Sequence, residues 1–278
     1  MPWEVVEGLG QVDTESPLWR YMDFAKFVDL VLNQHLFFPT LKTLAKVDPY
    51  EGAFTKEEVK IALAMELSPD DLKQTSDSAK TAAGVSCWYL GSDESEAMWR
   101  RYSGSVGVAI ETTVGRLITS LEDSKYRLNG GRVNYCDFAT HNKPFFDRGE
   151  LDWILRKRKS YEHEKEYRVI AWPDCHSDDT CRKDVDSSAS DFSTQIHGEE
   201  SSQINGEGLS VECDVSKLIR RVVVGPRTFD PLKSLCESIM KSKGLVVSVK
   251  RSKMVEPPHE LSPEDYKWVE DMKKSRAD

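Results

Sequence analysis

The residues most suited to chemistry form one run, from Tyr161 to Arg168 (Tyr-Glu-His-Glu-Lys-Glu-Tyr-Arg), which leads into an apolar stretch ending at Trp172. On an extended chain, Glu164, Glu166 and Arg168 would share one face. A carboxylate held at the start of a strand can accept a proton or stabilise a developing cation. The competing interpretation is a solvated edge strand whose charges form cross-strand ion pairs.

Two further clusters combine aromatic and charged residues. Trp99 and Tyr102 lie three residues apart, so they would share one helix face and could form a wall against a flat ring. The pattern alone favours a core stripe. Arg20 and Tyr21 end a short strand, and an arginine beside an aromatic ring could hold a phosphate or a carboxylate. A surface arginine that rests its stem on apolar neighbours is the alternative.

A basic run, Arg156-Lys157-Arg158-Lys159, could contact a phosphate backbone. Trp153 and Ile154 precede it, which favours a solvated helix face instead.

Several well-known catalytic motifs are absent from the sequence. It contains no Walker phosphate loop, no Gly-x-Gly-x-x-Gly, no Gly-x-Ser-x-Gly and no His-Glu-x-x-His. Cys175, His176 and Cys181 could be half of a zinc site, but no second ligand pair has matching spacing, so we predict no metal. The six cysteines include no Cys-x-x-Cys pair. The first ten residues carry Glu4 and Glu7 and no basic residue, which is unlike a secretory signal, so we expect no disulfide framework and predict a reducing, cytoplasmic compartment.

The net charge of −9 on 278 residues comes mostly from one segment. Residues 174–209 hold nine acids and two bases, so the rest of the chain is nearly neutral and overall charge does not indicate a nucleic-acid partner. No apolar run approaches the roughly 20 residues that span a bilayer, so no membrane partner is expected. Residues 174–208 are poor in apolar side chains, and we predict that they form a disordered acidic insertion.

The elements that must position these residues follow from caps and periodicity. Thr55 with Glu58 forms a capping box and predicts a helix over 56–66, Ser68-Pro69 starts another, and Thr113 caps a third. Residues 151–161 are also predicted to be helical. Helices and short strands mix without regular alternation, which predicts an α+β fold with a mixed, mostly antiparallel sheet flanked by helices. We expect an N-terminal extension (1–17), a single domain (18–253) and a C-terminal helical tail (254–278).

Separated blocks of this sequence occur in the order seen in a widespread domain family of uncharacterised function, which the chain resembles. The blocks are Leu18-Trp19-Arg20-Tyr21, Leu36-Phe37-Phe38-Pro39, Asp48-Pro49-Tyr50-Glu51, Ser86-Cys87-Trp88, Met98-Trp99-Arg100-Arg101-Tyr102, Gly107-Val108-Ala109-Ile110-Glu111, Glu164-x-Glu166-Tyr167-Arg168 and Val222-Val223-Val224-Gly225-Pro226. Val47 stands where the family usually has Asn, and Pro39 where it often has Ser. In outline, the layout also resembles the ADP-ribosyltransferase superfamily.

This second resemblance implies an NAD-dependent ADP-ribosyltransferase or NAD hydrolase, with NAD as substrate. Glu166 would be the late-strand glutamate that stabilises the ribosyl cation, and Arg20 would grip the diphosphate as the second catalytic residue. The nicotinamide and ribose would be bound by a further set of residues: Tyr21, Trp99, Tyr102, Glu164 and Arg168.

Two other classes of function stay open. One is a non-catalytic module that binds a nucleotide or a partner, and the other is a metal-dependent nuclease using Asp48, Glu51, Glu164 and Glu166. The nuclease ranks third because these acids lack a recognisable metal spacing. Nucleic acid remains possible as an acceptor substrate.

Overall fold

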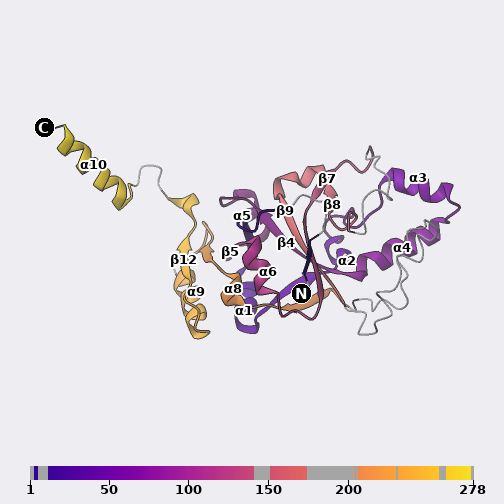
Figure 1. Ribbon diagram of the computed structural model, residues 1–278, viewed down its shortest axis with the longest axis horizontal. Helices are drawn as coiled ribbons and strands as arrows, with labels where there is room; N and C mark the ends of the chain where they lie inside the picture. The colour runs from indigo at the N-terminus through magenta and orange to yellow at the C-terminus, as the bar shows by residue number, and fades with distance from the viewer. Residues whose placement is uncertain are drawn as a thin grey trace.

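The computed structural model describes residues 3–5, 12–140, 151–173, 204, 206–229, 231–256 and 261–276. Its main sheet has eight strands in the order β1-β6-β9-β4-β2-β5-β11-β12 (Figure 1). In that order the strands are Trp3–Val5, Arg127–Arg132, Glu166–Trp172, Gly84–Leu90, Pro17–Asp23, Gly107–Thr113, Arg221–Val224 and Ser248–Arg251. Only the outermost pairs, β1 with β6 and β11 with β12, are parallel. The predicted α+β class with a mixed, mostly antiparallel sheet is confirmed.

Two small sheets flank the main one. β3 (His35–Pro39) pairs antiparallel with β10 (Gly208–Glu212), and β7 (Asn134–Cys136) pairs parallel with β8 (Arg156–Arg158). The helices are α1 (Phe24–Asn33), α2 (Leu41–Leu44), α3 (Lys56–Ala64), α4 (Pro69–Ala82), α5 (Glu96–Tyr102), α6 (Val114–Ser120), α8 (Val215–Leu218), α9 (Pro231–Ser242) and α10 (Pro263–Ser275). The described residues also include two 3₁₀ helices, η2 (Lys159–Glu164) and η4 (Lys253–Val255). No described helix is both long and apolar enough to cross a bilayer.

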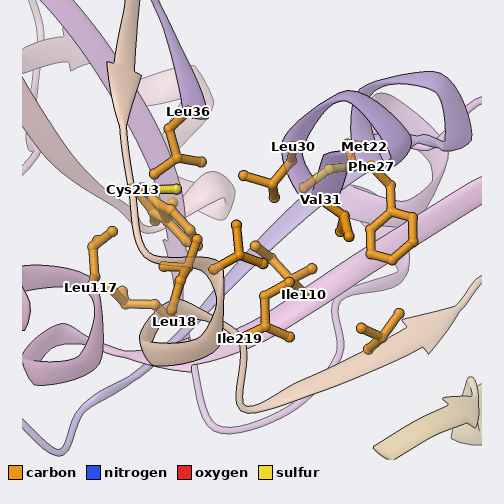
Figure 2. Close-up of a cluster of buried hydrophobic side chains, with 14 of the residues drawn as sticks. Leu18, Met22, Phe27, Leu30, Val31, Leu36, Ile110, Leu117, Cys213 and Ile219 are labelled. Atoms are coloured by element: carbon orange, nitrogen blue, oxygen red, sulfur yellow. The ribbon is translucent and has the colours of Figure 1, made fainter. Parts of the chain in front are cut away.

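Alternating residues of the central strands pack on opposite faces of the sheet. Leu18 and Ile110 face a large apolar cluster built with α1, α6, α8 and α9, part of which Figure 2 shows. Their neighbours Trp19 and Ala109 face a second cluster with α5. Because side chains of a strand alternate between faces, the chemistry of each face is fixed by register.

The sheet opens between β2 and β4. These strands pair only at Leu18 with Leu90 and at Trp19 with Tyr89, whereas β2 pairs with β5 at seven positions. β3 approaches β4 beyond this point, through a bridge between Thr40 and Gly84. A Cβ atom at Gly84 would lie 2.9 Å from the Phe38 carbonyl oxygen, so this close approach requires glycine.

The capping signals located the helix starts correctly. Capping boxes are present at Thr55, Ser68 and Ser262, and the side chain of Thr113 caps α6. The helix predicted over 151–161 is wrong: residues 151–155 form turns, and the basic run enters strand β8 and then η2. Apolar spacing misled here, because Leu151, Ile154 and Leu155 fill a core against β9 without forming a helix.

The predicted boundaries need two corrections. Residues 3–5 of the predicted N-terminal extension form β1 in the main sheet. Of the predicted acidic insertion, residues 174–203 and 205 lie outside the described residues, but Ile204 is buried and Gly208 belongs to β10. In the C-terminal tail, α10 is exposed along its length except at the half-buried Val269.

Candidate functional site

The candidate site lies where η2 passes into β9. Lys165 adopts the left-handed conformation, with φ of 40°, and reverses the chain between Glu164 in η2 and Glu166 in β9. The two glutamates therefore do not belong to one extended strand, as the sequence suggested. They approach each other through the turn and through a shared partner, Lys157 of β8.

We call this buried set of charges the Lys157 network: Glu51, Lys157, Glu164, Glu166 and Arg168. The Lys157 Nζ lies 2.5 Å from Glu164 Oε2, 2.6 Å from Glu166 Oε1 and 3.4 Å from Glu51 Oε1. Arg168 donates to Glu166 Oε2 and to Glu51 Oε1, both at 2.8 Å. All five side chains are buried. Burial of so many charges is costly, and it is compensated only because every acid is paired with a base.

The surroundings shift the pKa values of Glu164 and Glu166 in opposite directions. Burial raises the pKa of Glu164 above its ordinary value. Burial would also raise the pKa of Glu166, but the adjacent Arg168 and Lys157 hold it well below its ordinary value. One carboxyl therefore binds a proton more readily than usual, and its neighbour stays an anion.

Tyrosine and arginine side chains surround the network where it meets solvent. Glu164 is fully covered by α5: Tyr102 Oη donates to its Oε1 at 2.8 Å, and Arg101 Nε lies 2.9 Å from the same oxygen. Tyr102 is 38 % exposed and the Arg101 side chain 34 % exposed. A ligand that approached Glu164 would have to displace these two side chains.

A second arginine, Arg158, belongs to the same surface. We call this surface the rim, and it consists of Tyr50, Arg101, Tyr102, Arg158 and Tyr161. Arg158 lies 2.7 Å from Asp48 and stacks on Tyr50, with its Cζ 4.6 Å from the ring centroid. Tyr161 lies between the two arginines, with the Cζ atoms of Arg101 and Arg158 at 5.1 and 5.3 Å from its ring centroid. The rim thus combines aromatic faces with cations, and both types of group bind nucleotides.

Two carboxylate oxygens at the site lack a hydrogen-bond donor among the described residues. Asp48 Oδ2 and Glu51 Oε2 are buried and accept no hydrogen bond from the described residues. Both belong to the loop between α2 and α3. Since a buried acceptor without a donor is costly, a water or a ligand hydroxyl bound here would be stabilising.

The aromatic residues predicted to bind the ring take two different positions. Trp99 and Tyr21 are buried and pack edge to face, with centroids 4.9 Å apart. Trp99 Nε1 donates to Glu94, and Tyr21 Oη accepts from the Ser95 backbone. These two residues form core that fixes α5 to the sheet, whereas Tyr102 reaches the rim.

Arg20 does not join the site. Its guanidinium donates to Ser86 Oγ and to the Phe37 carbonyl oxygen and stacks on Trp88. Ser86 and Trp88 project from the face of β4 opposite to that of Tyr89, which is the register partner of Glu166. The sheet therefore separates Arg20 from Glu166, and the expectation that they share one pocket is wrong.

Sequence reasoning missed Lys157, Arg158 and Arg101. The helix predicted over 151–161 assigned the first two to a solvated face. The signal that could have found Lys157 was alternation: in a strand, Lys157 points away from Arg156 and Arg158.

The acids proposed for a metal site are already neutralised. Glu51, Glu164 and Glu166 pair with Lys157 and Arg168, and Asp48 pairs with Arg158. Within the described ranges, no group of three or more His, Cys, Asp or Glu residues is placed to hold a metal ion. The cysteine and histidine pattern at 175–181 lies outside them.

A scan against protein-family models, a search of curated proteins and a search of solved structures each found no match to this chain. The two family resemblances therefore stay predictions from the sequence blocks, and the Lys157 network and the rim are the features of the structure that bear on function.

Proposed function

We propose that this chain cleaves the N-glycosidic bond of NAD, as an ADP-ribosyltransferase or an NAD hydrolase, at the Lys157 network. One observation carries the proposal: two buried glutamates share a single lysine, and their surroundings move their pKa values in opposite directions. Enzymes that break glycosidic bonds commonly use two carboxyl groups whose pKa values differ because of their surroundings.

The chemistry would divide between the two carboxyl groups. Cleavage of the bond to nicotinamide sends the electron pair to the leaving ring nitrogen and builds positive charge on the ribose carbon. Glu166, held as an anion, would stabilise that charge. A water or acceptor hydroxyl then bonds to the carbon, and Glu164, whose pKa is raised, would take the released proton.

Binding would use the rim. Arg101 and Arg158 are each about one-third exposed and would attract the diphosphate, the role that Arg20 cannot fill from the far face of the sheet. Tyr102 and Tyr50 offer exposed rings for stacking. Trp99 and Tyr21 would act indirectly, because they hold α5 in place.

The test measures nicotinamide release from NAD by the full chain and by two variants. Glu166→Gln should retain the fold and lower turnover by at least about 100-fold, since one preorganised electrostatic group is worth that much. Glu162→Gln, an exposed glutamate in the same segment, should leave turnover unchanged. If the wild-type chain neither releases nicotinamide nor binds NAD in calorimetry, the proposal is wrong.

A second candidate function is a binding module without turnover. It is favoured by the fact that every carboxylate oxygen of Glu164 and Glu166 already has a donor or cation partner, so the network is stable with no substrate. This candidate predicts that a nucleotide raises the melting temperature without any product forming. A thermal-shift screen over nucleotides, followed by chromatography of the same samples, distinguishes it from the enzyme.

A further inference from the structure

Arg20, in the middle of the main sheet, has no acidic partner. On β2, Leu18, Arg20 and Met22 share one face, and Leu18 and Met22 belong to the large apolar cluster. Arg20 is half-buried between them. The groups that its guanidinium contacts are all neutral, namely Ser86 Oγ, the Phe37 carbonyl oxygen and the Trp88 ring, and it forms no ion pair with any described residue. A positive charge therefore enters an apolar face without compensation.

Buried cations elsewhere in the strands are compensated. Arg156 lies within ion-pair distance of Glu58 and Asp152, and Lys157 and Arg168 pair with the acids of the Lys157 network. Burial lowers the pKa of Arg20, whereas the glutamates raise the pKa of Lys157 despite its burial. Because an unpaired charge is costly to bury, an anion bound beside Arg20 would stabilise the folded chain.

The cysteines near Arg20 cannot supply that negative charge. Cys87 and Cys213 interact electrostatically with the guanidinium. Burial raises the pKa of both thiols to about 12, so both are neutral at pH 7. The charge of Arg20 thus lacks a partner among the ionisable groups that influence it.

Hydrogen-bond donors converge where the sheet opens. Arg20 is the first residue of β2 beyond the two positions at which that strand pairs with β4, and its guanidinium spans the opening to Ser86 of β4. The fully buried Ser86 Oγ also accepts from Trp88 Nε1 at 3.0 Å, so the hydroxyl proton of Ser86 remains to be donated. No described residue accepts that proton or the remaining N–H groups of Arg20. The opening therefore offers donors without acceptors.

We propose that Arg20 and Ser86 bind a small oxyanion, a phosphate or a carboxylate group, at the opening between β2 and β4. The guanidinium suits both groups, because its planar fork can donate two parallel N–H bonds to a pair of oxygens. The site uses no residue of the Lys157 network or the rim, and the sheet separates it from Glu166. It therefore does not depend on NAD turnover.

The test measures urea denaturation of the full chain in sodium phosphate, sodium acetate and sodium chloride at equal pH and ionic strength. An anion that binds only the folded state raises the free energy of unfolding in step with the logarithm of its concentration, above its dissociation constant. The general effect of each salt is common to all variants, so the differences between variants report the site. Phosphate, acetate or both should stabilise the wild-type chain beyond chloride, and the comparison of the two identifies the group bound.

Arg20→Gln should abolish this anion-specific gain. Arg20→Lys keeps the charge but loses the fork, so it should weaken the apparent affinity about tenfold or more, and it serves as the test if the glutamine variant does not fold. A merely structural role of Arg20 would lower stability equally in all three salts. That result, or a wild-type chain that gains nothing from either oxyanion, would overturn the proposal.

Arg116→Gln is the matched control. Arg116 is also half-buried, but its Nη2 donates to the carbonyl oxygens of Ser216 and Ile219 near the end of α8. The variant removes the same charge and should leave the apparent affinity for the anion within about twofold of the wild type. Circular dichroism verifies that each variant folds. An equal loss of the gain in Arg116→Gln would mean that net charge, and not the Arg20 site, attracts the anion.

Discussion

Lys157 connects the three carboxylates of the buried network, because its ammonium group lies within ion-pair distance of Glu51, Glu164 and Glu166. Each of these acids has another partner, but among the described residues only Lys157 contacts all three. Ionised carboxylates that are buried close together repel one another strongly. The ammonium group of Lys157 offsets this repulsion, so the three acids can remain together in the folded chain.

Replacing Lys157 by methionine should destabilise the fold. The variant keeps the volume of the side chain but leaves Glu164 and Glu166 buried beside each other without their shared cation. We expect a loss of about 3–5 kcal/mol in the free energy of unfolding, measured by urea denaturation. Lys125→Met, at an exposed position, should change it by less than about 0.5 kcal/mol. Equal stability of the two variants would show that the network does not hold the fold.

The two glutamates should respond differently to pH. The folded-state pKa of Glu166 is depressed, so its stabilising contribution is present above the unfolded pKa of about 4.3 and is lost as pH falls toward the folded value. The folded-state pKa of Glu164 is raised, so its ionised form is destabilising at neutral pH, and protonation relieves this as pH falls.

We therefore expect Glu166→Gln to cost more stability at pH 7 than Glu164→Gln, by about 1 kcal/mol or more. Glu166→Gln should also flatten the fall in stability between about pH 5 and pH 3. Urea denaturation across that range measures both effects. A reversed order of the two variants at pH 7 would mean that Glu164 is the ionised member of the pair.

At the scale of elements, the N-terminus of α3 connects a helix cap to a buried ion pair. Glu58 accepts from the Thr55 backbone N–H at 2.6 Å through Oε2, and from Arg156 at 2.7 Å through Oε1. In turn, the Thr55 hydroxyl oxygen accepts a hydrogen bond from the Glu58 backbone N–H. The same carboxylate therefore starts α3 and fixes β8, the strand that carries Lys157.

Thr55→Ala should lower the free energy of unfolding by about 1–2 kcal/mol, because it removes the hydroxyl from the capping box. Thr55→Ser keeps that hydroxyl and should cost less than half as much. Thermal denaturation followed by circular dichroism distinguishes them. If the serine variant is as unstable as the alanine variant, the buried threonine methyl group, and not the cap, is what matters.

At the scale of the whole molecule, α10 stands apart from the rest of the chain. Its residues are exposed except for the half-buried Val269, with Tyr266 at 59 % and Trp268 at 64 %, and Figure 1 shows it projecting away from α9 and β12. A helix of this length that buries little apolar surface adds little to global stability.

Ending the chain at Glu256 should therefore leave the free energy of unfolding within about 0.5 kcal/mol of the full chain. Urea denaturation at equal protein concentration provides the comparison, and the buried Val249→Ala variant gives the scale of a true core loss, about 1–3 kcal/mol. A loss on truncation as large as that of Val249→Ala would mean that α10 docks on the protein in solution.

Local chemistry made several features of this protein readable from sequence alone. The capping signals at Thr55, Ser68 and Thr113 act within four residues, so they identify helix starts without tertiary information. The mixture of short strands and helices predicted the α+β class. The run from Tyr161 to Arg168 was recognised as the most chemically suited segment, and it does enter the buried network.

Tertiary structure decided which of these residues meet. The positions of Glu164 and Glu166 depend on the reversal at Lys165, and Lys157 joins them only because β8 packs across the start of β9. Arg20 and Glu166 are separated because strand register places them on opposite faces of the sheet. Charges distant in sequence meet only where the packing of the elements that carry them brings them together, and neither composition nor spacing contains that information.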